Sequence, residues 1–149
     1  MKVCEEFYIN GEWVKPVNDL KTLDVINPAT EEVFGRIALG DKDDVDAAVE
    51  AAYSAFESFG YSSVDERVSL LEKILEVYQG KYDEIAETIS SEMGAPIGLS
   101  KAAQAATGLG HFSTALETLK NYKFEEVKGS ALIRKEPIGV VGMITPWNW

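Results

Sequence analysis

The sequence predicts an incomplete α/β fold, in which β-hairpins come first, a helical layer follows, and a parallel sheet begins near the end of the chain. Turn signals between short strand-like stretches occupy the first forty residues, and apolar residues recur at helical spacing over most of 41–122. Near the end lies an uninterrupted apolar run, Gly139–Ile144. A run of this length without polar alternation is typical of a strand that is buried on both faces of a parallel sheet.

Two hairpins are predicted at the start of the chain. Asn10 and Gly11 supply the positive φ angles of a type I′ turn, so residues 7–14 should form two strands joined by a two-residue loop. A turn at 27–30 divides residues 22–38 into a second hairpin. Both hairpins are interpreted as scaffold.

Four amphipathic helices are predicted to follow. Their spans are 41–59, 63–79, 81–93 and 100–122. Gly80 and Gly94 are the expected C-terminal stops of the second and third helices. Gly108 and Gly110 lie inside the fourth helix and should weaken it, unless close packing uses their lack of a side chain.

Acidic residues mark two of the helix starts. Asp41 and Asp44 lie in the first turn of the first helix, where the helix dipole favours negative charge. Ser63 and Glu66 have the spacing of a capping box. We therefore interpret these acids as caps, and the sequence predicts no metal site.

Composition limits the class of partner. The net charge of −11, from 14 basic and 25 acidic residues, argues against binding to nucleic acid or to an anionic membrane surface. A single cysteine, Cys4, excludes an internal disulfide. No apolar run approaches the ~20 residues of a membrane span, and Met1–Glu12 has no signal-peptide core, so a cytoplasmic location is expected.

Charged and apolar residues alternate in Phe124–Glu136. This pattern predicts an exposed strand pair that projects from the body and needs partners at its edges. Beyond it, Pro137 and Pro146 flank the apolar run, where a missing N–H does no harm to a strand ladder. Trp147 and Asn148 follow the carboxyl end of that predicted strand, which faces the ligand crevice in open α/β sheets.

Several motifs in order resemble the aldehyde dehydrogenase superfamily. They are Phe7–Trp13, the turn Asn27–Glu31, the approach Arg134–Gly139, and Pro146-Trp147-Asn148. The resemblance implies the N-terminal part of that fold. Residues 1–123 would be the hairpins and helical layer of the cofactor-binding domain, 124–136 the start of an oligomerisation arm, and 137–149 the truncated first strand of a Rossmann-like sheet.

The resemblance also implies an activity, the oxidation of an aldehyde to a carboxylic acid with NAD or NADP through a cysteine thiohemiacetal and thioester. In that family the asparagine at the position of Asn148 stabilises the oxyanion, a role that a preorganised amide dipole suits. Ile144, Thr145, Pro146 and Trp147 would contact the cofactor. A homodimer or homotetramer is expected. Spacing alone favours interpreting Asn148 as a turn residue after a strand, and only the family resemblance reverses this preference.

The family's nucleophilic cysteine, general-base glutamate and cofactor-phosphate lysine are expected in later segments, so these 149 residues should be inactive. Cys4 lies in the wrong segment for the nucleophile, and His111 is interpreted as a polar position on a helix. Two alternatives stay open. One is a non-catalytic helical interaction module, and the other is a CoA-acylating or semialdehyde dehydrogenase relative.

Overall fold

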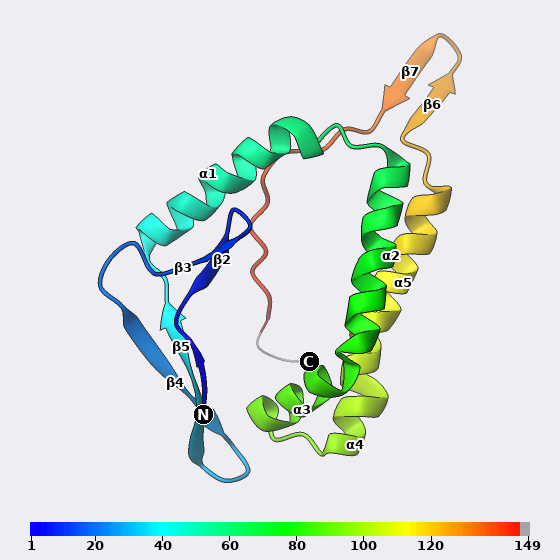
Figure 1. Ribbon diagram of the computed structural model, residues 1–149. Coiled ribbons are helices and arrows are strands. Elements are labelled where there is room, and N and C mark those ends of the chain that lie inside the picture. Colours follow the sequence, from blue (N-terminus) through cyan, green and yellow to red (C-terminus); the bar gives the residue numbers. More distant parts are fainter. Residues whose placement is uncertain (147–149) are drawn as a thin grey trace.

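A computed structural model describes residues 1–146. The first five strands lie on one side of an open frame and two long helices lie on the other, and a third long helix runs across the top between the two sides (Figure 1). The strands are β1 (Lys2–Cys4), β2 (Phe7–Ile9), β3 (Glu12–Val14), β4 (Lys21–Asn27), β5 (Glu32–Leu39), β6 (Glu125–Lys128) and β7 (Ala131–Arg134). The helices are α1 (Lys42–Phe59), α2 (Val64–Gly80), α3 (Tyr82–Met93), α4 (Ile97–Leu99), the π-helical turn η1 (Ser100–Ala105) and α5 (Ala106–Asn121). None of these helices is long and apolar enough to cross a membrane.

Both predicted N-terminal hairpins are confirmed. Strands β2 and β3 pair antiparallel around Asn10 and Gly11, whose φ angles of 54° and 81° are those of the expected type I′ turn. Strands β4 and β5 also pair antiparallel. Strand β1, which pairs parallel with β5, was not predicted from the sequence. Three residues carry no periodic signal of their own, so this pairing depends on β5 being formed already.

The capping interpretation of the first acidic cluster is confirmed. Asp41 is the N-cap of α1, and it forms a reciprocal capping box with Asp44. The hydrogen bond from the Asn18 side chain, followed by that from the Asp43 amide, lowers the pKa of Asp41. Across residues 1–146, no group of three or more histidine, cysteine or acidic side chains is arranged to hold a metal ion.

Helix α1 forms as predicted, but much of its apolar stripe is exposed, including Val45, Val49 and Tyr53. Among the described residues, the buried apolar side chains are Ala38, Ala86, Ala105 and Leu116. The core is therefore small. It lies where α2, α3 and the η1–α5 helix pack together, and between β5 and its neighbours. The amphipathic pattern predicted the helix correctly, although the described residues do not cover its apolar face.

The helix ends agree with the sequence in part. Ser63 and Glu66 form the predicted capping box at the start of α2, and Gly94, with a φ of 69°, ends α3 in the left-handed region. The prediction that Gly80 stops the second helix is wrong by one residue. Gly80 is the last residue of α2, and the chain turns at Lys81, which has a negative φ of −106°. No left-handed residue is required there.

The single helix predicted over 100–122 is also corrected. The chain turns first through α4, then widens into the π-helical turn η1, and becomes α-helical only from Ala106. The exception allowed for close packing applies at Gly108, where a Cβ would lie 2.3 Å from the Tyr78 hydroxyl oxygen, but not at Gly110, where a Cβ would meet nothing within 4 Å.

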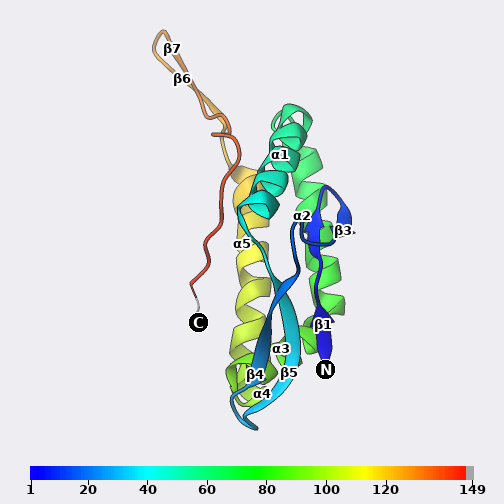
Figure 2. The same ribbon diagram turned by 90° about the vertical axis from the view of Figure 1, so that its left-hand side faces the viewer.

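The strand pair predicted within 124–136 is confirmed as the hairpin β6–β7. It projects beyond the ends of α2 and α5, as both views show (Figures 1 and 2). Glu125 lies opposite Arg134, and the side chains of Val127 and Leu132 are exposed. Neither outer edge of this hairpin pairs with another strand of residues 1–146.

The buried strand predicted over Gly139–Ile144 is not formed. Residues 135–146 adopt no helix or strand, and they run back toward the middle of the molecule from the base of the hairpin (Figure 1). A strand that is buried on both faces needs parallel neighbours and covering helices. No strand in the described part of the chain pairs with these residues. The apolar run is therefore left exposed.

Candidate functional site

The residues predicted to contact a cofactor lie at the end of the irregular segment 135–146. Ile144, Thr145 and Pro146 are all exposed, and Ile144 retains 98% of its accessible surface. Trp147 and Asn148 lie outside the described residues. These three exposed residues could contact only one side of a nicotinamide cofactor. Other residues would have to form the remaining walls of its site.

The two other residues considered for chemistry are dispersed. Cys4 is a free, exposed cysteine on β1, and His111 is exposed on α5. Neither residue lines the hollow described below. The described residues thus bring no nucleophile and base together at the predicted site.

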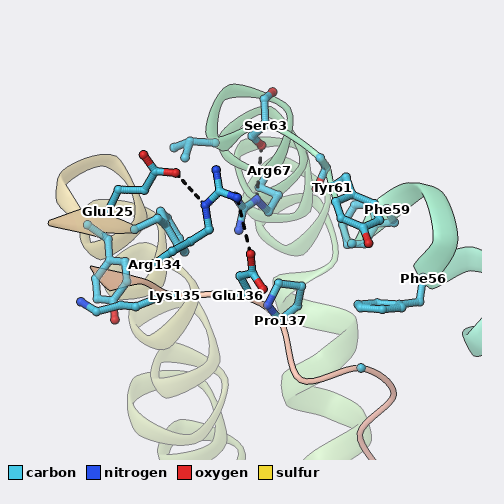
Figure 3. Close-up of a pocket in the computed structure, with 16 residues that line it drawn as sticks. Phe56, Phe59, Tyr61, Ser63, Arg67, Glu125, Arg134, Lys135, Glu136 and Pro137 are labelled. Carbon is cyan, nitrogen blue, oxygen red and sulfur yellow. Dashed lines mark hydrogen bonds and ion pairs between the residues drawn. The ribbon is translucent and has the colours of Figure 1, made fainter. Parts of the chain in front are cut away.

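A hollow of about 900 Å³ lies at the base of the hairpin β6–β7, where the end of α1, the start of α2 and the segment after β7 meet (Figure 3). Part of its wall is formed by rings. The ring-bearing residues are Phe56, Phe59, Tyr61, Tyr122, Phe124 and Pro137. The rings come from three stretches of the chain, 56–61, 122–124 and Pro137, so the hollow forms only when these stretches assemble.

Charged side chains line the rim of this hollow. Arg134 Nε donates to Glu125 Oε1 at 2.8 Å, and Arg134 Nη1 lies 3.6 Å from Glu136 Oε1 (Figure 3). The hydrogen bond and charge of Glu125, and then the charge of Glu136, raise the pKa of Arg134. All three side chains are more than half exposed, so these ion pairs add little stability.

Two cations flank a pair of aromatic rings at the base of the hairpin. The Arg67 guanidinium carbon lies 4.8 Å from the centre of the Phe124 ring, which meets the Tyr122 ring edge-on at 4.8 Å. The Lys135 ammonium lies 4.4 Å from the centre of the Tyr122 ring. We call these four residues the cation–ring clamp. It ties α2 to the chain on both sides of the hairpin.

The clamp is reinforced by the backbone, because the Lys135 amide donates to the Phe124 carbonyl at 2.8 Å. Arg67 is held in turn by a hydrogen bond from its Nε to the Ser63 carbonyl oxygen at 3.3 Å. The Ser63 hydroxyl is engaged in the capping box of α2. These groups can orient the hairpin and the segment after it, and they offer no free nucleophile.

Replacing Phe124 by leucine is expected to loosen the hairpin, because it removes the ring that both Arg67 and Tyr122 contact. The cation–π and ring–ring contacts together are worth about 1–2 kcal/mol. Amide hydrogen exchange over 123–136 should therefore accelerate by roughly 5–30-fold. Phe124→Tyr keeps the ring and should exchange at the original rate. Equal rates for Phe124→Leu and the parent would contradict the clamp.

The clamp was not predicted from the sequence, although the register of the hairpin indicates part of it. Once 124–136 is read as a hairpin, the pairing of Glu125 with Arg134 places Phe124 beside Lys135. What the hairpin register could not supply is Arg67, because it comes from a helix that packs there only in the folded chain.

Known proteins resemble this chain in sequence. A family model described as "Aldehyde dehydrogenase family" matches residues 13–149. The protein named "Putative aldehyde dehydrogenase" from Staphylococcus aureus (strain bovine RF122 / ET3-1) is 52% identical over 142 residues, which are 95% of this chain and 30% of that protein. The chain thus spans about 30% of the length of the curated relatives that it matches.

Solved structures agree in fold. An aldehyde dehydrogenase from Bartonella henselae superposes with a TM-score of 0.83 at 41% identity, covering 87% of this chain and 28% of that one. A cysteine-to-alanine mutant of aldehyde dehydrogenase C from Pseudomonas syringae, in complex with NAD+ and octanal, superposes with a TM-score of 0.88 at 38% identity. The second superposition covers 91% of this chain and 28% of that one.

Proposed function

The chain belongs to the aldehyde dehydrogenase family, and from this premise we propose that it is the N-terminal part of an enzyme that oxidises an aldehyde to a carboxylic acid with NAD or NADP. The observation that carries the proposal is the extent of the family match, which runs through Pro146-Trp147-Asn148 to residue 149. The Pseudomonas syringae relative, bound to NAD+ and octanal, supports both the cofactor and the class of substrate.

In this proposal Asn148 donates its side-chain amide to the oxygen of the aldehyde as that oxygen gains negative charge. Such a donor favours the transition state over the ground state, because the charge it meets is present only after attack. Ile144, Thr145, Pro146 and Trp147 supply one edge of a cofactor groove. The other walls of that groove come from residues beyond these positions.

The attacking group is a cysteine thiolate that forms a thiohemiacetal and then a thioester. Cys4 is the one cysteine among the 149 residues and lies exposed on β1, so we assign the nucleophile to a segment outside this sequence. The proposed organisation is 1–123 as part of the cofactor-binding domain, 124–136 as the start of the arm, and 137–149 as a segment that becomes the first sheet strand when parallel neighbours from other residues are present. In this proposal the intact protein is a cytoplasmic homodimer or homotetramer.

The test compares the polypeptide of the intact gene, here called the full-length protein, with residues 1–149 alone. The full-length protein should reduce NAD+ or NADP+ in the presence of an aldehyde, as measured by absorbance at 340 nm, whereas residues 1–149 should not. Mass spectrometry of the polypeptide, purified from its natural source and then denatured, should give a mass well above 16.4 kDa. A native species of that smaller mass would instead favour a non-catalytic module.

The product decides between the two kinds of enzyme. Release of a free carboxylic acid in the absence of CoA supports the proposal. A reaction that proceeds only with CoA and yields an acyl-CoA would assign the protein to the CoA-acylating relatives.

A further inference from the structure

The helix that runs from α4 through α5 contains one widened turn, η1, and this turn is among the best buried parts of the molecule. Ser100 and Ala105 are fully buried, and Gln104 is nearly so. Ser100 Oγ donates to Gln104 Oε1 at 3.1 Å, and Gln104 Nε2 lies 3.7 Å from the sulfur of Met93 on α3. Helix α3 packs on η1, whereas α2 packs on α5.

A regular α-helix would place the two buried ends of this segment on opposite faces. Each residue of an α-helix advances by about 100°, so Leu116 would lie about 160° around the axis from Ser100, on nearly the opposite face. Ser100 is 0% exposed and Leu116 is 8% exposed. A π-helical turn takes up one extra residue, and this reduces the separation to about 60°. The widened turn therefore brings both residues to one side of the helix.

Two tyrosine hydroxyls hold the ends of the widened turn. The Tyr82 hydroxyl donates to the Lys101 carbonyl oxygen, and the Tyr78 hydroxyl donates to the Ala105 carbonyl oxygen at 2.9 Å. In a π-helical turn a carbonyl oxygen accepts from the amide five residues on instead of four. A carbonyl oxygen has a second lone pair, and at the two ends of η1 a tyrosine hydroxyl donates to it. Burial, and secondly the neighbouring Tyr82, raises the pKa of the Tyr78 hydroxyl, which keeps its proton available.

Gly108 completes the arrangement by leaving room for the Tyr78 hydroxyl. A Cβ at Gly108 would lie 2.3 Å from that oxygen, whereas a Cβ at Gly110, one half-turn further on, would meet nothing within 4 Å. The Tyr78 ring also packs against Phe112 at 6.1 Å between ring centres. The hydroxyl of Tyr78 is thus directed at the helix backbone by contacts on both sides.

We propose that η1 is a register-setting turn, locked by the hydroxyls of Tyr78 and Tyr82. It absorbs one residue so that a single helix packs its start on α3 and its end on α2. The turn thereby also determines the face from which α5 delivers Tyr122 and Phe124 to Arg67 in the cation–ring clamp.

The first test compares two single-residue deletions in the full-length protein, both at exposed positions. Deleting Ala102 within η1 lets the turn close into a regular α-helix with the register of α5 unchanged, so the protein should stay folded and lose only a few degrees of Tm. Deleting Thr114 within α5 rotates Leu116 by about 100° and should prevent folding or lower Tm far more. Equal damage by the two deletions, or equal tolerance of both, would overturn the proposal.

The second test removes the hydroxyls without changing the rings. Tyr78→Phe and Tyr82→Phe should each lower Tm by about 2–4 °C, whereas Tyr53→Phe, on the exposed stripe of α1, should leave Tm unchanged. In the background that lacks Ala102, no widened turn is left for the hydroxyls to hold, so Tyr78→Phe and Tyr82→Phe should lower Tm by less than they do in the parent. The same loss of Tm in both backgrounds, or no loss in the parent, would show that the hydroxyls do not lock the turn.

Discussion

Replacing Asn148 by alanine in the full-length protein is expected to lower kcat by about 10²–10³-fold, the usual cost of losing one oxyanion donor. The affinity for NAD or NADP, measured by fluorescence titration, should not change, because the proposed role of the amide is directed at the substrate oxygen. Since the amide meets a full charge only after thiolate attack, KM should change much less than kcat. An unaffected kcat would remove the assigned role.

Two further variants separate charge from packing at this position. Asn148→Asp has nearly the same shape but sets a negative charge against the forming oxyanion, so its kcat should fall at least as far as that of Asn148→Ala. Asn121→Ala, at the exposed end of α5, removes only a hydrogen bond from the Asn121 side chain to the Glu117 carbonyl oxygen, and kcat should stay at the parent value. If Asn148→Asp were as active as the parent, a packing role would replace the electrostatic one.

Among the single substitutions, the largest loss of stability is expected for Asp44→Ala. Asp44 is 6% exposed, and its two carboxylate oxygens accept from the Val17 amide at 2.8 Å and the Asp41 amide at 2.9 Å. One side chain therefore joins the loop before β4 to the start of α1. Its removal leaves two amides without this partner, at a cost of about 2–4 kcal/mol. Urea unfolding followed by circular dichroism should show the transition at lower urea.

Controls in the same helix make this prediction specific. Asp46→Ala removes an exposed carboxylate that pairs with Lys42 four residues away, and it should cost less than about 0.5 kcal/mol. Asp44→Asn keeps one carbonyl acceptor and should fall between the parent and Asp44→Ala. A midpoint for Asp44→Ala that equals that of Asp46→Ala would mean that the link between Val17 and α1 does not contribute.

Much of the local structure could be predicted because its causes are local. Asn10 and Gly11 carry the positive φ angles of their turn, and Asp41 and Ser63 satisfy amides only a few residues away. Such interactions form whatever the rest of the chain does. The hairpin within 124–136 was predictable for the same reason, since its register depends on a short turn between two strands.

The features that were not predicted from the sequence share a different cause. A period of three to four residues cannot distinguish one α-helix from an α-helix interrupted by a π-helical turn, because the extra residue is chosen by what packs on each half. Arg67 contacts Phe124 only because α2 packs near the hairpin. Strand β1 forms only because β5 is present to pair with it. The apolar run Gly139–Ile144 showed strand composition, but the described residues contain no strand that pairs with it.

The sequence by itself determined the family, the caps and turns, and the motif that ends in Asn148, because these depend on residue types at short spacing. Only the tertiary structure decided that η1 widens under Tyr78 and Tyr82, and that Arg67 meets Phe124 at the base of the hairpin. Both arrangements need side chains from segments tens of residues apart. Their free energy arises only when those segments are brought into contact, and no local pattern encodes that approach.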